Sequence, residues 1–194
     1  MRLGILLDEL SQRGVLDDTL VIVASDHGEH LGDHGLFFHG CSLYRQVVGV
    51  PLVIAGPNRV PAGRVVGEPV SLCDIPATVV DLLGPLRDVP FPGRSLARVW
   101  AGNEEVGDSS SKPLLMETGK PPSLTNQGRE PTAKGPMKGL VAEGMHYIRR
   151  GDGVEELYLL KSDPQEQSNV ASYPFASEPL RRFRAAVSAM LKKQ

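Results

Sequence analysis

Apolar residues recur at helical spacing near the start of the chain. Four leucines occupy positions i, i+3, i+4 and i+7, namely Leu3, Leu6, Leu7 and Leu10. This spacing predicts an amphipathic helix, and Gly14 is well placed to end it. The following run 19–24 ("TLVIVA") is apolar without alternation. Such a run predicts a strand whose two faces are both covered by other elements.

Helical and extended patterns continue to alternate up to about residue 101. The apolar run 50–56 ("VPLVIAG") predicts a second strand. Asp74 can cap a helix that runs to Leu83, because its carboxylate can accept hydrogen bonds from the first turn, and Gly84 is a typical terminator. The alternation predicts an α/β domain over residues 1–101, with helices covering a mainly parallel sheet.

The rest of the chain changes character twice. Residues 102–136 are rich in Gly, Pro, Ser and Lys with little periodicity, which predicts an irregular loop connection. Residues 137–194 contain three short apolar runs separated by glycines, a pattern typical of an antiparallel meander. A helical stripe with Leu180, Phe183 and Val187 then follows. We therefore expect a small C-terminal antiparallel subdomain with a closing helix.

Composition argues against two classes of partner. The chain has 194 residues and a formal net charge of −2, whereas a nucleic-acid-binding face needs an excess of basic residues against the phosphates. No apolar run approaches the roughly 20 residues that a membrane-spanning helix requires. Cys41 and Cys73 form neither a metal-ligand spacing nor a disulfide framework. We expect no nucleic-acid or membrane partner, and the compartment stays open because no secretion signal is recognisable.

Four of the five histidines lie directly after the first predicted strand, between positions 27 and 39. Ligands in open α/β sheets bind just beyond the carboxyl ends of strands, and Asp26 and His27 stand there. A hard divalent cation prefers carboxylate oxygens, and a neutral imidazole can join them. Adjacent residues can both reach one cation only in a turn, which Gly28 helps to form. His39 follows an apolar "LFF" run, which can place its ring at the edge of a pocket.

Two other interpretations of the histidines stay open. His27, His30 and His34 have offsets that can share one helix face and bind zinc, although the intervening glycines would interrupt such a helix. A single histidine is also more often a surface or core residue than a ligand. On this interpretation we expect His30 and Glu29 to be solvated.

Four segments stand out along the chain in a fixed order. They are "DDTLVIVASDHGEHLGDHGLFFHGCSLYRQVVGVPLVIAGP", "PVSLCDIPATVVDLLG", "FPGRSL" and "HYIRRGDGVEELYLLKSDPQEQSNVA". Together they resemble the sulfatase family, within the alkaline-phosphatase-like superfamily. The resemblance implies that residues 1–101 are the C-terminal part of an α/β catalytic domain with an alkaline-phosphatase-like sheet, and that the last segment forms a small C-terminal sheet.

The resemblance also implies a metal-assisted sulfuric ester hydrolase. In the family, the Asp of the "SDHG" element and the residue after it bind calcium or a similar divalent cation, and here these are Asp26 and His27. Many members have a Lys thirteen positions after that Asp, where it contacts the sulfate and the leaving-group oxygen. This chain has His39 there, so we expect His39 to steady the sulfate or protonate the departing oxygen. The expected substrate is a small-molecule or carbohydrate sulfate ester.

The chain also departs from the family pattern. The family nucleophile is a Cys or Ser in a "CxPSR"-like or "SxPSR"-like motif that is oxidised to formylglycine, and no such motif occurs in this sequence. We therefore expect a C-terminal portion of a sulfatase, with formylglycine and further metal ligands in a missing N-terminal half. Such a fragment is expected to have negligible activity alone and to self-associate through an exposed sheet edge.

Two other functions stay open. Relatives with this fold hydrolyse phosphate monoesters, phosphate diesters or phosphonates with the same metal chemistry, and the nucleophile best separates them from sulfatases. The chain can also be a catalytically inert truncated protein. In that case Asp26 and His27 are turn residues and His39 is a surface residue.

Overall fold

The computed structural model describes residues 2–84, 91–100, 112–119 and 130–192. These residues belong to two compact units that interleave along the chain. The first unit is Met1–Asp26 with Pro51–Asp108, and the second unit is His27–Val50 with Ser109–Gln194. The histidine-rich segment therefore belongs to the same unit as the C-terminal strands.

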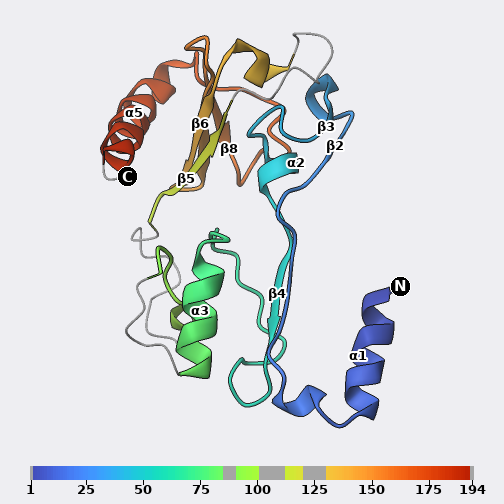
Figure 1. The fold of residues 1–194 in the computed structure, drawn as a ribbon. Coiled ribbons are helices and arrows are strands. Elements are labelled where there is room, and N and C mark those ends of the chain that lie inside the picture. The colour runs from blue at the N-terminus through green and yellow to red at the C-terminus, as the bar shows by residue number, and fades with distance from the viewer. Residues whose placement is uncertain (1, 85–90, 101–111, 120–129, 193–194) are drawn as a thin grey trace. The chain divides into compact units, whose positions relative to one another are not determined.

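The described residues of the first unit form helices and strands in alternation, as expected (Figure 1). The elements are α1 (Arg2–Gln12), a 3-10 turn (Leu16–Asp18), β1 (Val21–Ala24), β4 (Leu52–Ala55), α3 (Asp74–Leu83) and α4 (Ala97–Trp100). The predicted N-terminal helix, both predicted strands and the helix from Asp74 to Leu83 are confirmed.

The pairing of the two strands of the first unit differs from the expectation. β4 runs antiparallel to β1, with Val21 opposite Ala55 and Ala24 opposite Leu52. We expected a mainly parallel sheet, and this pair is an antiparallel one. A parallel partner needs a crossover that returns the chain to its starting edge, whereas residues 27–50 leave the first unit and belong to the second. Many α/β sheets carry one such antiparallel strand.

The "GRSL" segment is held by the first turns of α3. The buried carboxylate of Asp74 accepts hydrogen bonds from the backbone N–H of Arg94 at 2.8 Å and of Ser71 at 3.1 Å. The Thr78 hydroxyl accepts the N–H of Leu96 at 2.8 Å. Each of these three donors is thus satisfied by a side chain of α3. We call this set of hydrogen bonds between α3 and the "GRSL" segment the clasp.

The second unit contains a four-stranded antiparallel sheet, closed by a helix. Its elements are β2 (His30–Leu31), β3 (Phe37–Phe38), α2 (Arg45–Val48), β5 (Leu114–Thr118), β6 (Met137–Ala142), β7 (Met145–Arg149), β8 (Glu155–Leu159) and α5 (Ser177–Leu191), with 3-10 turns at Asp33–Gly35, Pro131–Lys134 and Pro174–Ala176. The sheet order is β5-β6-β7-β8. The predicted meander and closing helix are confirmed, and β5 adds a strand within residues 102–136, where we expected irregular structure.

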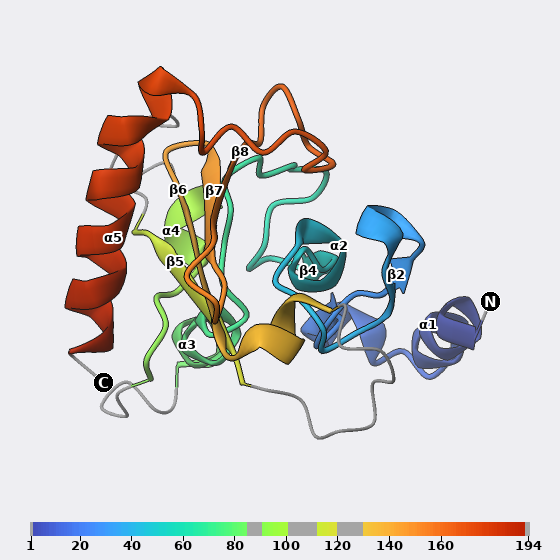
Figure 2. The same ribbon diagram turned by 90° about the horizontal axis from the view of Figure 1, so that it is seen from above.

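The two faces of this sheet pack against different parts of the second unit. On one face, Leu140, Tyr147 and Leu157 form a buried cluster with the predicted stripe of α5. On the other face, Ile148 and Tyr158 form a cluster with the segment that precedes α2. Figures 1 and 2 show α5 and α2 on opposite sides of the sheet. The C-terminal sheet is therefore the support for the histidine-rich segment.

A tight turn fixes the register of the meander. Glu143 and Gly144 both have positive φ, 54° and 70°, between β6 and β7. A two-residue loop with this geometry matches the right-handed twist of the flanking strands. Among the described residues, none of the helices has the length and apolar character needed to cross a membrane.

The clasp around Asp74 gives a first testable prediction. Replacing Asp74 by Ala removes the charged acceptor of two partly buried N–H groups, which lowers the free energy of unfolding by about 1–3 kcal/mol. Urea titration followed by circular dichroism measures the change. Asp81→Ala is the control, because it removes a carboxylate of the same helix that bonds the Ser95 hydroxyl at the surface. Equal losses for the two variants would contradict the assignment of Asp74 as the clasp.

Candidate active site

A glycine fixes the turn that begins the histidine-rich segment. The N–H of Gly28 donates to the carbonyl of Val47 in α2 at 2.7 Å. A Cβ at position 28 would lie 2.0 Å from the carbonyl oxygen of Gln46. No side chain fits at that distance, so only glycine lets the turn approach α2 this closely. The two neighbours of Gly28, His27 and Glu29, are therefore held beside α2.

Two of the three predicted site residues lie together in the second unit. The rings of His27 and His39 stack with centroids 4.0 Å apart and an angle of 25° between their planes. His39 Nδ1 lies 2.9 Å from the carboxylate of Glu29, and His27 Nδ1 lies 2.8 Å from the carbonyl oxygen of Gly28. Because a carbonyl oxygen and an ionised carboxylate only accept, Nδ1 is the donor in both rings. Nε2 is then the nitrogen of each ring that can coordinate a cation or act on a substrate.

Glu29 is a residue whose contact the sequence analysis missed. We expected it to be solvated, and its side chain is indeed 42% exposed. It nevertheless forms an ion pair with His39 when that ring is protonated, and it orients the ring in either state. The two residues are ten positions apart, which is no helix or strand period. No periodic pattern in the sequence could therefore have predicted the contact between Glu29 and His39.

Asp26 is the last residue of its segment in the first unit and is exposed. One carboxylate and one imidazole nitrogen fit a hard cation, but only as part of its shell, because calcium takes six to eight ligands. Among the described residues, no group of three or more His, Cys, Asp or Glu side chains could hold a metal ion. Calcium binding by Asp26 and His27 therefore stays a prediction.

The zinc interpretation of His27, His30 and His34 is wrong, because these three described residues do not form a metal-binding group. His34 has φ 53°, so no helix places the rings on one face. Its ring instead stacks on Tyr44, with centroids 3.9 Å apart. The glycines of this stretch produce a hairpin, β2–β3, in place of a helix.

His30 is buried, so the expectation that it is solvated is wrong. It is 1% exposed, and its Nε2 lies 2.7 Å from the Ser42 hydroxyl. Burial lowers the pKa of His30, and the neighbouring His34 lowers it further. The ring is therefore neutral near pH 7. A buried, neutral His30 belongs to the packing of the hairpin rather than to the exposed pair His27 and His39.

The apolar run before His39 lies mostly at the surface. Phe37 and Phe38 are 63% and 73% exposed, whereas Leu36 is buried. Phe38 has φ 69°, which a bulky side chain rarely adopts. Such strain persists only where surrounding contacts impose it and is common next to functional residues. Here it turns the chain immediately before His39.

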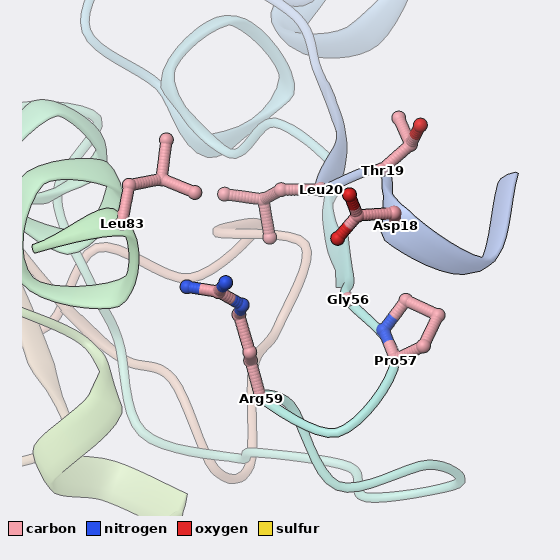
Figure 3. A pocket seen from close by; sticks show the side chains of 7 residues that line it. All are labelled: Asp18, Thr19, Leu20, Gly56, Pro57, Arg59 and Leu83. Atoms are coloured by element: carbon pink, nitrogen blue, oxygen red, sulfur yellow. The ribbon is translucent and has the colours of Figure 1, made fainter. Parts of the chain in front are cut away.

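A separate hollow lies in the first unit (Figure 3). It has an empty volume of about 270 Å³, which includes space open to solvent, and its lining residues are Asp18, Thr19, Leu20, Gly56, Pro57, Arg59 and Leu83. These residues come from the segment just before β1, the loop after β4 and the end of α3. Arg59 donates to the carbonyl of Leu82 there. The hollow contains none of the predicted site residues, which follow the other end of β1.

The family model and the similar curated proteins both point to the same family. The sequence model of the family described as Sulfatase matches residues 2–85. The choline-sulfatase of Rhizobium meliloti (strain 1021) is 31% identical over 176 residues, which cover 89% of this chain and 31% of that protein. The chain spans about 30% of the length of the curated relatives it matches.

Two solved structures share the fold. The phosphonate monoester hydrolase of Agrobacterium radiobacter has a TM-score of 0.77 and 27% identity, over 99% of this chain and 39% of that chain. A 2-O GAG sulfatase has a TM-score of 0.77 at 23% identity, over 96% of this chain and 39% of that chain. The alkaline-phosphatase-like fold class expected from the sequence is thereby confirmed. This chain carries part of a sulfatase domain.

Proposed function

We propose that the chain contributes one side of the active site of a sulfuric ester hydrolase. In this proposal Asp26 and His27 help to bind a divalent cation, and His39 acts on the leaving group. The observation that carries the proposal is the stacked pair of His27 and His39, with Glu29 on His39 Nδ1. His27 belongs to the "SDHG" element, and both histidines lie in the part of the chain that matches the sulfatase family model.

His39 has the geometry of a proton donor to a departing oxygen. Its Nδ1 is bonded to Glu29, so Nε2 faces away from the carboxylate on the opposite edge of the ring. The carboxylate holds the ring in one orientation, as in other pairs of a histidine and an acid that orients it. The side chain is 51% exposed, which leaves it accessible to a substrate.

Asp26 and His27 are the residues that would hold the cation. A bound calcium ion would neutralise the negative oxygens of the ester and lower the barrier to substitution at sulfur. The Gly28 carbonyl fixes the His27 ring through Nδ1, so Nε2 is the atom presented to the cation. The carboxylate of Asp26 would supply the hard oxygen ligand that such a cation prefers.

The attacking group lies outside these residues in this proposal. By family resemblance it is a formylglycine in a part of the sulfatase domain that this sequence does not contain. The 194 residues alone would then bind a cation weakly and hydrolyse no sulfate ester. This part of the proposal is supported by the lack of a "CxPSR"-like motif in the sequence and by the share of its relatives that the chain spans.

The substrate class in this proposal is a sulfate ester of a small molecule or a carbohydrate. The printed names of similar proteins include a choline-sulfatase and a 2-O GAG sulfatase. A second candidate is hydrolysis of a phosphonate monoester, which is favoured by the similarity to the phosphonate monoester hydrolase. Sulfate esters and phosphonate monoesters both carry one negative charge, so the two candidates need similar electrostatic surroundings.

A leaving-group series tests the role of His39. In the longest natural form of the protein that carries these residues, His39→Ala lowers kcat for alkyl sulfates by about 10²–10⁴-fold, because a poor leaving group needs a proton. The loss is much smaller for 4-nitrophenyl sulfate, whose phenolate leaves unaided. His34→Ala is the control, since it removes a histidine of the same hairpin that stacks on Tyr44. Equal losses on both substrates would contradict a proton-donor role.

Calorimetric titration with calcium tests the role of Asp26. We expect Asp26→Ala to weaken calcium binding by at least about tenfold, because it removes the charged oxygen ligand. Asp8→Ala, which removes an exposed carboxylate of α1, serves as the control. The measurement needs no turnover. Identical affinities for the two variants would remove Asp26 from the cation site.

Matched esters separate the two candidate reactions. The same protein is assayed with 4-nitrophenyl sulfate and with a 4-nitrophenyl phosphonate monoester, which share a leaving group and a charge. The proposal predicts the larger kcat/KM for the sulfate, because transition-state binding is then tuned to sulfur. A larger kcat/KM for the phosphonate would contradict the sulfatase proposal and favour phosphonate monoester hydrolysis.

A further inference from the structure

Two buried carboxylates from the C-terminal part of the chain hold the segment that carries His27 and His39. Glu156 in β8 is 5% exposed, and Glu166 in the loop after β8 is 1% exposed. A buried carboxylate is costly unless it is paired and hydrogen-bonded. The partners of these two therefore indicate why they are retained.

Glu166 joins the sheet to the start of α2. One carboxylate oxygen lies 2.6 Å from Nδ1 of the buried His146 in β7, and the other accepts the backbone N–H of Arg45 at 2.8 Å. The same loop accepts two more bonds from α2, because the Arg45 side chain donates to the Pro164 carbonyl and the Gln46 side chain to the Gln165 carbonyl. His146 itself is 1% exposed.

Glu156 makes a second attachment on the same face of the sheet. It accepts the hydroxyl of Tyr44 at 3.2 Å and the hydroxyl of Tyr158 at 3.0 Å. Burial, followed by the charge of Glu156, raises the pKa of both phenols, so they remain protonated donors. Tyr44 directly precedes α2. The start of this helix is thus held by both carboxylates.

The attachment continues from α2 to the candidate active site. Glu166 fixes the N–H of Arg45, the first residue of α2, and the carbonyl of Val47 in the same helix accepts the N–H of Gly28 at 2.7 Å. Gly28 has no room for a side chain against α2. A displacement of α2 must therefore move this turn, and with it His27 and Glu29.

The backbone conformation of Glu166 is consistent with a specific role for its side chain. Its φ is 57°, in the left-handed region where glycine is the least strained residue. A non-glycine residue there is strained, because its Cβ comes too close to the following carbonyl oxygen. A glutamate in this conformation is retained for what its carboxylate contacts. Those contacts are His146 and the N–H of Arg45.

We infer that Glu166 is a positioning residue for the proposed reaction: its carboxylate fixes α2, and α2 fixes the turn that carries His27 and Glu29 opposite His39. This inference rests on the proposed function for its catalytic meaning. The geometric part, that Glu166 sets the stack of His27 and His39, can be tested without turnover.

The experiment records the ring signals of ¹³C,¹⁵N-labelled histidines in the 194-residue chain by NMR. Stacked rings shift each other's signals, so the signals of His27 and His39 report their stack. Gly28→Ala is the positive control, because it displaces the same turn directly. Glu166→Ala is expected to move both sets of signals in the direction seen for Gly28→Ala.

A matched control separates positioning from loss of stability. Glu155→Ala removes a carboxylate of β8 that bonds Tyr147 and Arg184 on the α5 side of the sheet. It is expected to leave the ring signals of His27 and His39 unchanged. Unchanged signals in Glu166→Ala, or equal shifts in Glu155→Ala, would overturn the inference.

Two conservative variants keep the test decisive if Glu166→Ala does not fold. Glu166→Gln keeps the length of the side chain and an acceptor for the Arg45 N–H, so it is expected to retain signals close to the native ones. Glu166→Asp keeps the charge and shortens the reach by one methylene, so it is expected to shift them. Native signals in Glu166→Asp would refute the positioning role.

A kinetic readout separates this inference from the proposed function. In the longest natural form of the protein, Glu166→Asp is expected to lower kcat for sulfate esters by about 10–100-fold with little change in KM, because a small misplacement of a reacting group is costly. An inactive native protein would count against the proposed function and leave the NMR result to decide the positioning. Full activity in Glu166→Asp with shifted signals would contradict the role in catalysis.

Discussion

The contact between Gly28 and α2 is the constraint on which the candidate site depends. It is a single hydrogen bond, 2.7 Å long, at a place where a Cβ would lie 2.0 Å from a carbonyl oxygen. The turn therefore has one close-packed arrangement. His27 and Glu29 flank this glycine, and both contact His39. The position of His39 therefore depends on the backbone of Gly28, through the two neighbours of that glycine.

The buried polar groups of the C-terminal sheet explain how that contact is maintained. Strand alternation divides β7 and β8 into an apolar face under α5 and a face that carries His146 and Glu156. Buried charges remain stable only when partners satisfy them. Glu156 and Glu166 each have one partner beside or in α2, Tyr44 and Arg45, so the polar groups of the sheet and the position of the site segment are coupled. Hydrogen bonds have direction, so they fix an orientation that apolar packing alone would leave free.

Local patterns predicted the elements well and the contacts between distant segments poorly. The apolar spacing of α1, the run of β1 and the stripe of α5 each report a local period, and each prediction is confirmed. The burial of His30, the pair of Glu29 and His39 and the role of Glu166 depend on segments that meet only in the folded chain. The resemblance selected His27 and His39 as site residues, the structure stacks their rings, and their metal and catalytic roles stay predictions. The antiparallel pairing of β4 also depended on the path of the chain through the second unit.

A crystal structure of the longest natural form of the protein, with calcium and a bound sulfate, tests the central claim most directly. The account predicts the carboxylate of Asp26 and Nε2 of His27 on the cation, and Nε2 of His39 within hydrogen-bond distance of a sulfate oxygen. It also predicts that Glu29 remains on Nδ1 of His39. A sulfate bound at a different place, with the rings of His27 and His39 separated, would contradict it.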